Sequence, residues 1–583
     1  MQFSYENQPE DEFLPEHTQS MRKALQYCHQ LVQDCHQNHS LPPPLLSCNK
    51  VATLVDGSYK LTPRPVIEID PQATEAAHRI QEQRQQALTQ FWKRQQEWLD
   101  CCGIKQGKED GGLLPAAVAS FKSCNSSDEV VQNMVIDTID MASSSSRSSS
   151  SPPPTVVEFR QKYQNANQPC LIRGLDKTAY FSSVCSKWRQ QSNEDTTHDN
   201  HGPKNYLVNK DWFRMTIGGD TMVPVRFQPF SSTHSDANAL DEEGRAEECK
   251  TKNMTLDQWM ELLEQSGEKE FYEDHYLKDW HLQSFLRDRA NQYQPERITA
   301  TNTSHTEPCL YEVPPYFEHD ILNDFLTRFT QKGDYKFTYW GPKGSRTSLH
   351  SDVMNSYSWS FNVRGTKEWK FYPPQISSSE SSTPSNGDEQ QNPPSPSNPT
   401  KSESAALVVV RHAGECIFVP CGWTHEVTNL EESLSINHNW ITTGNIDQTW
   451  DCLCQEMKAI ETELKAWSID ESCWDARESM LRGCVGLDVS AFFLMILTRL
   501  LELLLLSLQA LEYTGGNGIG SDDTNTRWTL HFDMARLKEA LRTLFCPQDD
   551  DVNIENRLST VLQSGEASAS AVTIAVWAME SIS

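Results

Sequence analysis

Apolar and polar residues alternate through the middle of the chain, which is typical of β-strands that turn one face toward a core. The clearest case is the segment 357–363, Tyr-Ser-Trp-Ser-Phe-Asn-Val. A turn signal, Arg-Gly-Thr, occupies 364–366. A second strand is predicted over 367–372, and the prolines at 373 and 374 end it. Further strands are expected at 335–339, 407–411 and 416–419. Several short antiparallel strands of this kind predict a barrel made of two sheets.

Helical patterns flank this central part. Residues 1–115 are expected to be helical, and Asp70 with Pro71 forms a suitable N-cap and first-turn pair for a helix that runs toward Asp100. Residues 444–583 are also expected to be helical. We expect these C-terminal helices to pack beside the barrel or to mediate a homodimer. The pattern therefore predicts an α+β protein with a barrel between two helical regions.

Two low-complexity segments divide the chain. Residues 116–154 end in a run of serines and prolines, which predicts a linker before the central domain, 155–443. Residues 377–403 contain Ser, Pro, Asn and Glu but almost no large apolar side chains. We therefore expect this insert to be a disordered surface loop between two barrel strands.

The most apolar stretch, 492–511, has the length of a membrane-spanning helix. Arg499, Glu502 and Gln509 interrupt it, and charges are costly inside a bilayer. We therefore expect a buried helix of a soluble domain and no membrane contact. Residues 1–13 are acidic and lack an apolar core, so we expect no secretory signal there.

Charge and cysteine content bear on the expected partners and cellular location. The chain of 583 residues has 80 acidic and 51 basic side chains and a net charge of −29. Such a surface repels phosphate backbones, so we expect no direct nucleic-acid binding, and it favours a basic or lysine-bearing protein partner. Solvated charges that keep the protein soluble explain the excess as well. The 17 scattered cysteines indicate reduced thiols and a cytoplasmic protein, with a nuclear location as the alternative.

One triplet carries candidate chemistry. His350 and Asp352 lie two residues apart on a predicted strand, so their side chains are expected to share a face. A second histidine, His425, follows the tight corner Pro-Cys-Gly at 420–422, where we expect Cys421 to be structural rather than pocket-lining. Two nitrogens and one carboxylate oxygen suit a divalent iron held on one face, with open positions on the other. Satisfied polar residues in an ordinary barrel explain the same three side chains equally well.

Two other triplets of the same form show how weak this signal is alone. His234 and Asp236 lie in a polar run that predicts a loop, and His531 and Asp533 precede a helical pattern with no later histidine. We expect surface or packing roles for both. His350 differs because strands and a later histidine accompany it.

A lysine near the triplet supports the metal interpretation. Lys367 shares strand parity with Trp369 and Phe371, so its side chain points toward an apolar face. A buried ammonium is costly unless an anion meets it, and a bound dicarboxylate would supply that anion. The alternative is that Lys367 extends its charge to solvent at the strand end. Thr347 and Asn437 are candidates to contact the same carboxylate.

Four motifs occur in order along the central domain. They are Gln-Pro-Cys-Leu-Ile-Arg-Gly at 168–174, the segment 339–352 with His350 and Asp352, the segment 365–373 with Lys367, and the segment 414–425 with His425. Together they resemble the JmjC-domain family, the 2-oxoglutarate- and iron(II)-dependent oxygenases of the cupin superfamily. Three further segments resemble the JmjC-domain-containing protein 4 group within that family: 276–281, 311–317 and 433–440.

The resemblance implies a fold and a site. The fold is a double-stranded β-helix, or jelly-roll cupin barrel, with helical flanks. Iron(II) would be held by His350, Asp352 and His425. The distal carboxylate of 2-oxoglutarate would be bound by Lys367, Thr347 and Asn437. Ser360 and Thr424 depart from residues found in some relatives, which leaves the shape of the substrate pocket open.

The resemblance also implies an activity. It is hydroxylation of a protein lysine side chain with dioxygen as the oxidant, and the group's target class is a translation termination factor. Two alternatives stay open from the sequence. One is demethylation of histone N-methyl-lysine, although no zinc-binding reader motif accompanies the barrel. The other is a non-catalytic cupin scaffold, which would not need the triplet, the second histidine and Lys367 together.

Overall fold

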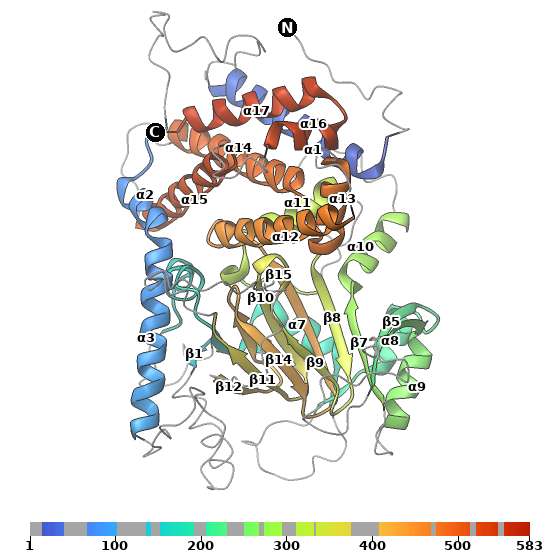
Figure 1. The fold of residues 1–583 in the computed structure, drawn as a ribbon. Coiled ribbons are helices and arrows are strands. Elements are labelled where there is room, and N and C mark those ends of the chain that lie inside the picture. Colours follow the sequence, from blue (N-terminus) through green and yellow to red (C-terminus); the bar gives the residue numbers. More distant parts are fainter. Residues whose placement is uncertain are drawn as a thin grey trace, which may run out of the picture.

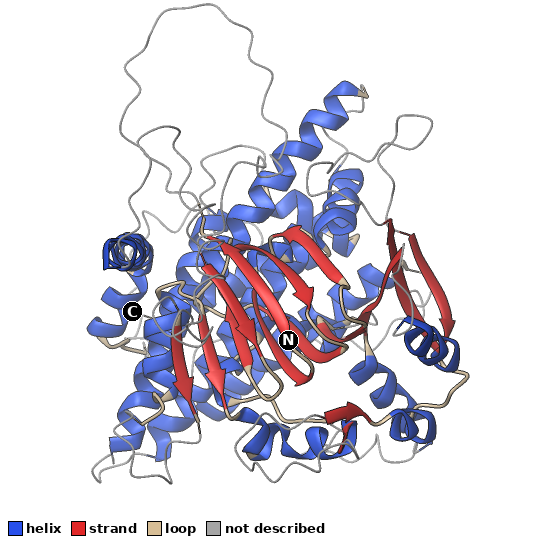
Figure 2. Ribbon diagram, turned by 90° about the horizontal axis from the view of Figure 1, so that it is seen from below, coloured by secondary structure: helices blue, strands red, loops and turns tan. Residues whose placement is uncertain are grey.

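Two β-sheets lie at the centre of the molecule with helices around them (Figures 1 and 2). The computed structural model describes residues 14–39, 67–101, 136–141, 152–191, 206–229, 250–266, 273–293, 310–330, 334–374, 407–467, 474–513, 521–545 and 553–582. The predicted insert 377–403 and the triplet His234–Asp236 lie outside these residues.

The described strands form a large sheet, a facing smaller sheet and one separate hairpin. The large sheet has the order β1-β2-β13-β10-β15-β8-β7-β5-β6, the smaller sheet the order β12-β11-β14-β9, and β3 pairs with β4. Strand bounds are β1 Asp137–Asp140, β2 Cys170–Arg173, β3 Arg189–Gln191, β4 Tyr206–Val208, β5 Met222–Pro229, β6 Lys250–Thr255, β7 Glu273–Trp280, β8 Lys336–Gly341, β9 Arg346–His350, β10 Tyr357–Arg364, β11 Lys367–Tyr372, β12 Leu407–Arg411, β13 Cys416–Val419, β14 Thr424–Asn429 and β15 Ser433–Trp440. All pairings are antiparallel except β1 with β2.

This architecture confirms the predicted α+β jelly-roll with helical flanks, although the sheets do not close into a continuous barrel. The strands expected at 357–363, 367–372, 407–411 and 416–419 are observed as β10 to β13, and the one at 335–339 as β8. β10 is buried along almost its whole length. Its aromatic face packs against a helix, since Phe361 stacks on Phe181 of α7 (Ala179–Trp188) with ring centroids 4.0 Å apart. Its polar face turns toward the smaller sheet.

The predicted linker contains one strand. Residues 137–140, within 116–154, form β1 and pair in parallel with β2. Ile136 and Ile139 are buried there, which gives this short segment enough apolar surface to join the sheet. Residues 116–135 lie outside the described part of the chain.

Further helices surround the sheets. Their bounds are α6 Val156–Phe159, α8 Lys210–Thr216, α9 Leu256–Ser266, α10 Leu282–Tyr293 and α11 Ile321–Phe329. Near the N-terminus, α2 (Pro71–His78) begins as predicted, because Asp70 caps it by accepting from the Gln72 amide at 2.8 Å. The helix is interrupted at Arg79, so two helices form where one was expected. The second, α3 (Ile80–Cys101), runs along the side of the sheets (Figure 1).

Helices from both ends of the chain form one helical body above the sheets (Figure 1). In it α1 (Glu16–His39) packs on α14 (Val489–Tyr513) in a common apolar core. The other members are α11, α12 Ile446–Ala466, α13 Trp474–Val485, α15 Ser521–Phe545, α16 Ile554–Leu562 and α17 Gly565–Glu580. Within this body, α12 lies on the side that faces the sheets (Figure 1).

α14 contains the apolar stretch discussed above. Among the described residues, its segment Val489–Ala510 is the one helix long and apolar enough to cross a membrane, and 78% of the most apolar part is buried inside the protein. Its charged residues have partners, since Arg499 pairs with Glu502 at 3.1 Å and Glu502 accepts from Tyr27 at 3.2 Å. Packing within the helical body therefore accounts for the hydrophobicity of α14 without a membrane.

Candidate metal and co-substrate site

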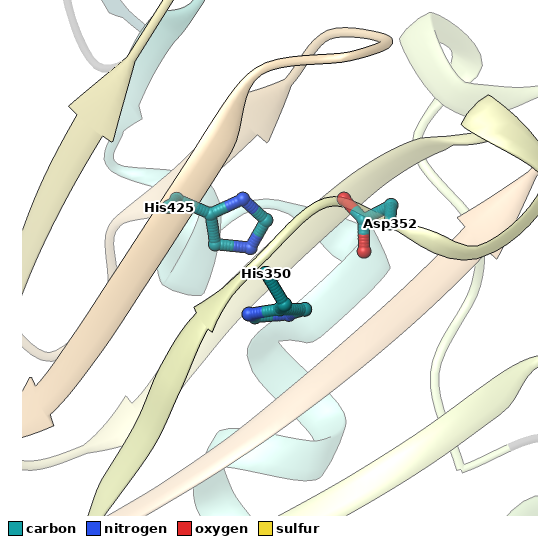
Figure 3. Close-up of side chains that lie close together, drawn as sticks. All are labelled: His350, Asp352 and His425. Carbon is teal, nitrogen blue, oxygen red and sulfur yellow. The ribbon is translucent and has the colours of Figure 1, made fainter. Parts of the chain in front are cut away.

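The smaller sheet brings the two distant histidines together. β14 pairs with β9 so that His425 lies opposite His350, and the two rings are 4.3 Å apart. Asp352 follows the end of β9. One ligand atom from each of the three side chains lies within 4.8 Å of the others. Figure 3 shows the three side chains pointing toward one shared space.

Hydrogen bonds orient both imidazoles. His350 Nδ1 lies 2.8 Å from the Ser348 carbonyl oxygen, and His425 Nδ1 lies 3.0 Å from the Trp423 carbonyl oxygen. A carbonyl can only accept, so Nδ1 carries the proton in each ring and Nε2 is left as the ligand atom. Burial, and then the neighbouring His425, lower the pKa of His350 to about 4. The neutral ring that binds metals is therefore the stable form.

Two neighbouring strands hold the carboxylate of Asp352. Ser358 on β10 donates to Oδ2 at 2.7 Å, and Asn439 on β15 donates to Oδ1 at 2.8 Å. Two imidazole nitrogens and one oriented carboxylate oxygen, gathered on one side of an open space, are the donor set that non-haem Fe(II) takes. The residues present fit that metal.

Lys367 lies on β11 at the inner end of the same pocket. Its side chain is buried, and its Nζ donates to Ser435 Oγ at 2.7 Å and to Tyr276 Oη at 3.1 Å. Among the described residues no carboxylate pairs with it. Burial, and then the nearby cations Arg411 and Lys278, hold the pKa of Lys367 well below its usual range. An anion bound in the pocket would reverse this shift.

The structure brings every predicted site residue into one pocket. Thr347, Lys367 and Asn437 line it together with the two histidines and Asp352. Asn437 donates to Ser435 Oγ at 3.1 Å, and the same hydroxyl oxygen accepts a hydrogen bond from Lys367. Ser360 also lines the pocket, and its buried hydroxyl has no hydrogen-bond partner in the part of the chain that the structure describes. Thr424 contacts Ser351 at 3.1 Å and does not line it.

Comparison with known proteins agrees with this geometry. A family model described as a cupin-like domain matches residues 156–445. The protein named 2-oxoglutarate and iron-dependent oxygenase JMJD4 is 35% identical over 225 residues in Danio rerio, covering 37% of this chain and 48% of that protein. Its Homo sapiens counterpart is 29% identical over 339 residues, covering 57% and 72%. The chain belongs to the JmjC family of cupin-like proteins.

Other relatives carry different names. A protein from Arabidopsis thaliana named arginine-specific demethylase JMJ20 is 30% identical over 359 residues, covering 58% of this chain and 66% of that protein. The matched segment spans about half the length of the Danio rerio and Gallus gallus relatives, at 48% of each. The family is thus shared by proteins named for different reactions.

Sequence reasoning missed several residues of this JmjC pocket. Tyr276 and Lys278 reach it from β7, two residues apart on one strand face. Both belong to the segment 276–281, which supported the family resemblance but did not show that its side chains line the pocket. Arg411 does not line the pocket, but it was also missed as a neighbour of Lys367: β12 places it opposite Lys367 in the sheet register and buries it fully. Burial lowers the pKa of Arg411 to about 10.

The third triplet has a packing role. The His531 Nδ1 accepts from the Asp70 amide at 2.9 Å, and Asp533 binds Arg160 and Thr443. Each side chain thus joins the helical body to a neighbouring segment, as expected. Among the described residues no second cluster of metal-ligand side chains occurs besides His350, Asp352 and His425. Cys421 is buried, binds Asn167 through its amide, and does not line the pocket.

Proposed function

We propose that the protein is an Fe(II)- and 2-oxoglutarate-dependent dioxygenase. The observation that carries the proposal is one pocket that holds a two-histidine, one-carboxylate donor set and a buried lysine with no carboxylate partner among the described residues. Fe(II) and 2-oxoglutarate, when bound, supply dioxygen activation coupled to decarboxylation of the oxo acid to succinate. The names of the JMJD4 relatives, 2-oxoglutarate and iron-dependent oxygenase, support the same cofactors.

Six residues of the pocket have a role in this proposal. His350, Asp352 and His425 hold the metal and leave its opposite side open. Lys367 meets the distal carboxylate of 2-oxoglutarate, with Thr347 and Asn437 beside it. The distal carboxylate would then supply the anion that the buried Lys367 lacks beside Arg411 and Lys278.

Succinate formation tests the proposal directly. The purified chain with Fe(II), 2-oxoglutarate and dioxygen should form succinate, and His350→Ala should abolish both metal binding and turnover because one of three metal ligands is lost. His412→Ala is the matched control, since His412 is exposed beyond β12 and away from the pocket. A wild-type protein that binds neither Fe(II) nor 2-oxoglutarate would favour the scaffold alternative.

We propose a protein lysine side chain as the substrate, in a translation termination factor. This rests on resemblance to the JmjC-domain-containing protein 4 group, and the net charge of −29 favours a basic partner. A second candidate is demethylation of a protein side chain, because one relative is named an arginine-specific demethylase. Mass spectrometry of cellular proteins with and without the enzyme separates them. Gain of one oxygen on lysine supports hydroxylation, and loss of methyl groups supports demethylation.

Location and assembly are also proposals. We propose a cytoplasmic protein, with nuclear location as the alternative, that binds neither nucleic acid nor membrane. A homodimer through the C-terminal helices stays a prediction. Most of the apolar surface of α14 packs within this chain. Among its described large apolar side chains, Leu506 is half-exposed. Sedimentation of the purified chain tests the dimer.

A further inference from the structure

The short turn after Asp352 has an unusual backbone. In η7 (Val353–Asn355), Met354 has φ 58° and ψ 20°, and Asn355 has φ 47°. Both are left-handed conformations, which residues other than glycine adopt at a cost and keep only where the surroundings hold them. Two such residues in succession directly follow a residue of the metal site. Something outside the turn must therefore hold it.

The helical body holds this turn. Met354 is 2% exposed and belongs to the apolar core of the helical body rather than to the core of the large sheet. Asn355 donates from Nδ2 to the Gln448 carbonyl at 3.3 Å, and Asn445 donates from Nδ2 to the Asn355 carbonyl at 3.3 Å. The turn is thus fastened by one apolar anchor and two hydrogen bonds to the start of α12.

The start of α12 is itself fixed by distant parts of the chain. Asp447 accepts from Arg84 of α3 at 2.7 Å and from Arg536 of α15 at 2.6 Å. Asn445 is fully buried, and its Oδ1 accepts from the Thr442 amide at 2.8 Å. Helices before and after the sheets therefore meet at the helix end that holds η7.

We propose that the helical body positions Asp352 through η7, and that Met354, Asn355 and Asn445 are positioning residues of the metal site. The inference rests on the proposed function in taking Asp352 as a metal ligand. Ser358 and Asn439 orient the carboxylate from the sheets, whereas η7 sets the course of the main chain that leaves it. A released turn would relax from its left-handed conformation and move Asp352 away from the two histidines.

A pair of methionine variants tests this proposal in the full chain. Met354→Ala and Met495→Ala remove the same side chain from the same apolar core, because Met495 on α14 is 1% exposed. Both should lower the unfolding midpoint. Only Met354→Ala should weaken binding of Mn(II), titrated without 2-oxoglutarate, by about tenfold or more, as loss of a support around metal ligands commonly does.

A second pair covers the case in which Met354→Ala does not fold. Asn355→Gly and Asn355→Ala both lose the side-chain bond to Gln448 and keep the carbonyl that Asn445 binds. Glycine adopts the left-handed φ freely and alanine does not. Mn(II) affinity should therefore fall more in Asn355→Ala than in Asn355→Gly.

Two outcomes would overturn the inference. Equal Mn(II) affinity in Met354→Ala, both Asn355 variants and the wild type would give η7 a structural role only, and the proposed function would stand. A wild-type chain that binds no Mn(II) or Fe(II) would overturn the proposed function and this inference with it.

Discussion

At the scale of single residues, Lys367 combines a cost in stability with the proposed contact to 2-oxoglutarate. Its ammonium is buried beside Arg411 and Lys278 with no described carboxylate to pair with it. Removing an uncompensated buried charge commonly leaves a protein equally or more stable. A lysine kept in such a place is best explained by a ligand that supplies the missing negative charge.

Lys367→Met should therefore separate stability from binding. Methionine has a similar length, so the unfolding midpoint should hold or rise, while 2-oxoglutarate affinity should fall by about 2 kcal/mol or more, roughly thirtyfold in Kd. Isothermal titration with Mn(II) in place of Fe(II) measures the affinity. Lys370→Met is the matched control on the same strand, because Lys370 binds Glu426 outside the pocket at 2.9 Å. Unchanged affinity in Lys367→Met would remove Lys367 from the site.

The same residue predicts a dependence on pH. The pKa of Lys367 in the folded protein lies well below 10.5, its ordinary value. At pH values between the folded-state pKa and 10.5, Lys367 carries a proton in the unfolded chain but not in the folded chain. Its contribution to the unfolding free energy of the ligand-free protein therefore rises with pH. The slope of unfolding free energy against pH should therefore be smaller in Lys367→Met than in the wild type, measured by urea unfolding at several pH values.

At the scale of elements, local sequence predicted β10 to β13. β10 alternates apolar and polar residues, and β12 and β13 are short apolar runs on either side of a turn. The meeting of His350 and His425 follows from the pairing of β9 with β14, which no local pattern specifies, so the triplet needed its accompanying motifs to be recognised. Tyr276 could not be assigned a role, since it enters the pocket only after β7 pairs with β8 in the large sheet. Arg411 shows the same limit, because an arginine at a strand end gives no sign of full burial.

The N-terminus of helix α2 was predicted correctly from the sequence, because Asp70 caps it and Pro71 begins it. Asp70→Ala removes the side chain that accepts from the Gln72 amide and should lower the free energy of unfolding by about 1 kcal/mol, measured in urea. Asp70→Asn keeps an oxygen that can accept this bond and should lie close to the wild type. If both variants were equally destabilised, the loss would come from the charge rather than from the cap.

At the scale of the whole molecule, helices far apart in sequence join the helical body to the sheets near the start of α12. Asp447 lies at this junction between Arg84 and Arg536, whose side chains are 7% and 8% exposed. Burial alone would raise the pKa of Asp447, but the two arginines hold it below its ordinary value. The folded state is therefore stabilised by the ionised carboxylate above pH 3.8, and this contribution is lost as pH falls through the lower folded-state pKa.

Asp447→Asn should reveal how much the molecule depends on this junction. The amide keeps the size of the side chain but leaves two buried guanidinium groups without an anion, which should cost about 3 kcal/mol of unfolding free energy. Glu539→Gln is the matched control, because Glu539 pairs with Arg542 on the surface of α15 at 3.5 Å and should change stability by less than about 0.5 kcal/mol. Urea unfolding followed by tryptophan fluorescence measures both. Equal effects in the two variants would mean that the junction contributes no more than a surface ion pair, and that apolar packing alone holds the helical body on the sheets.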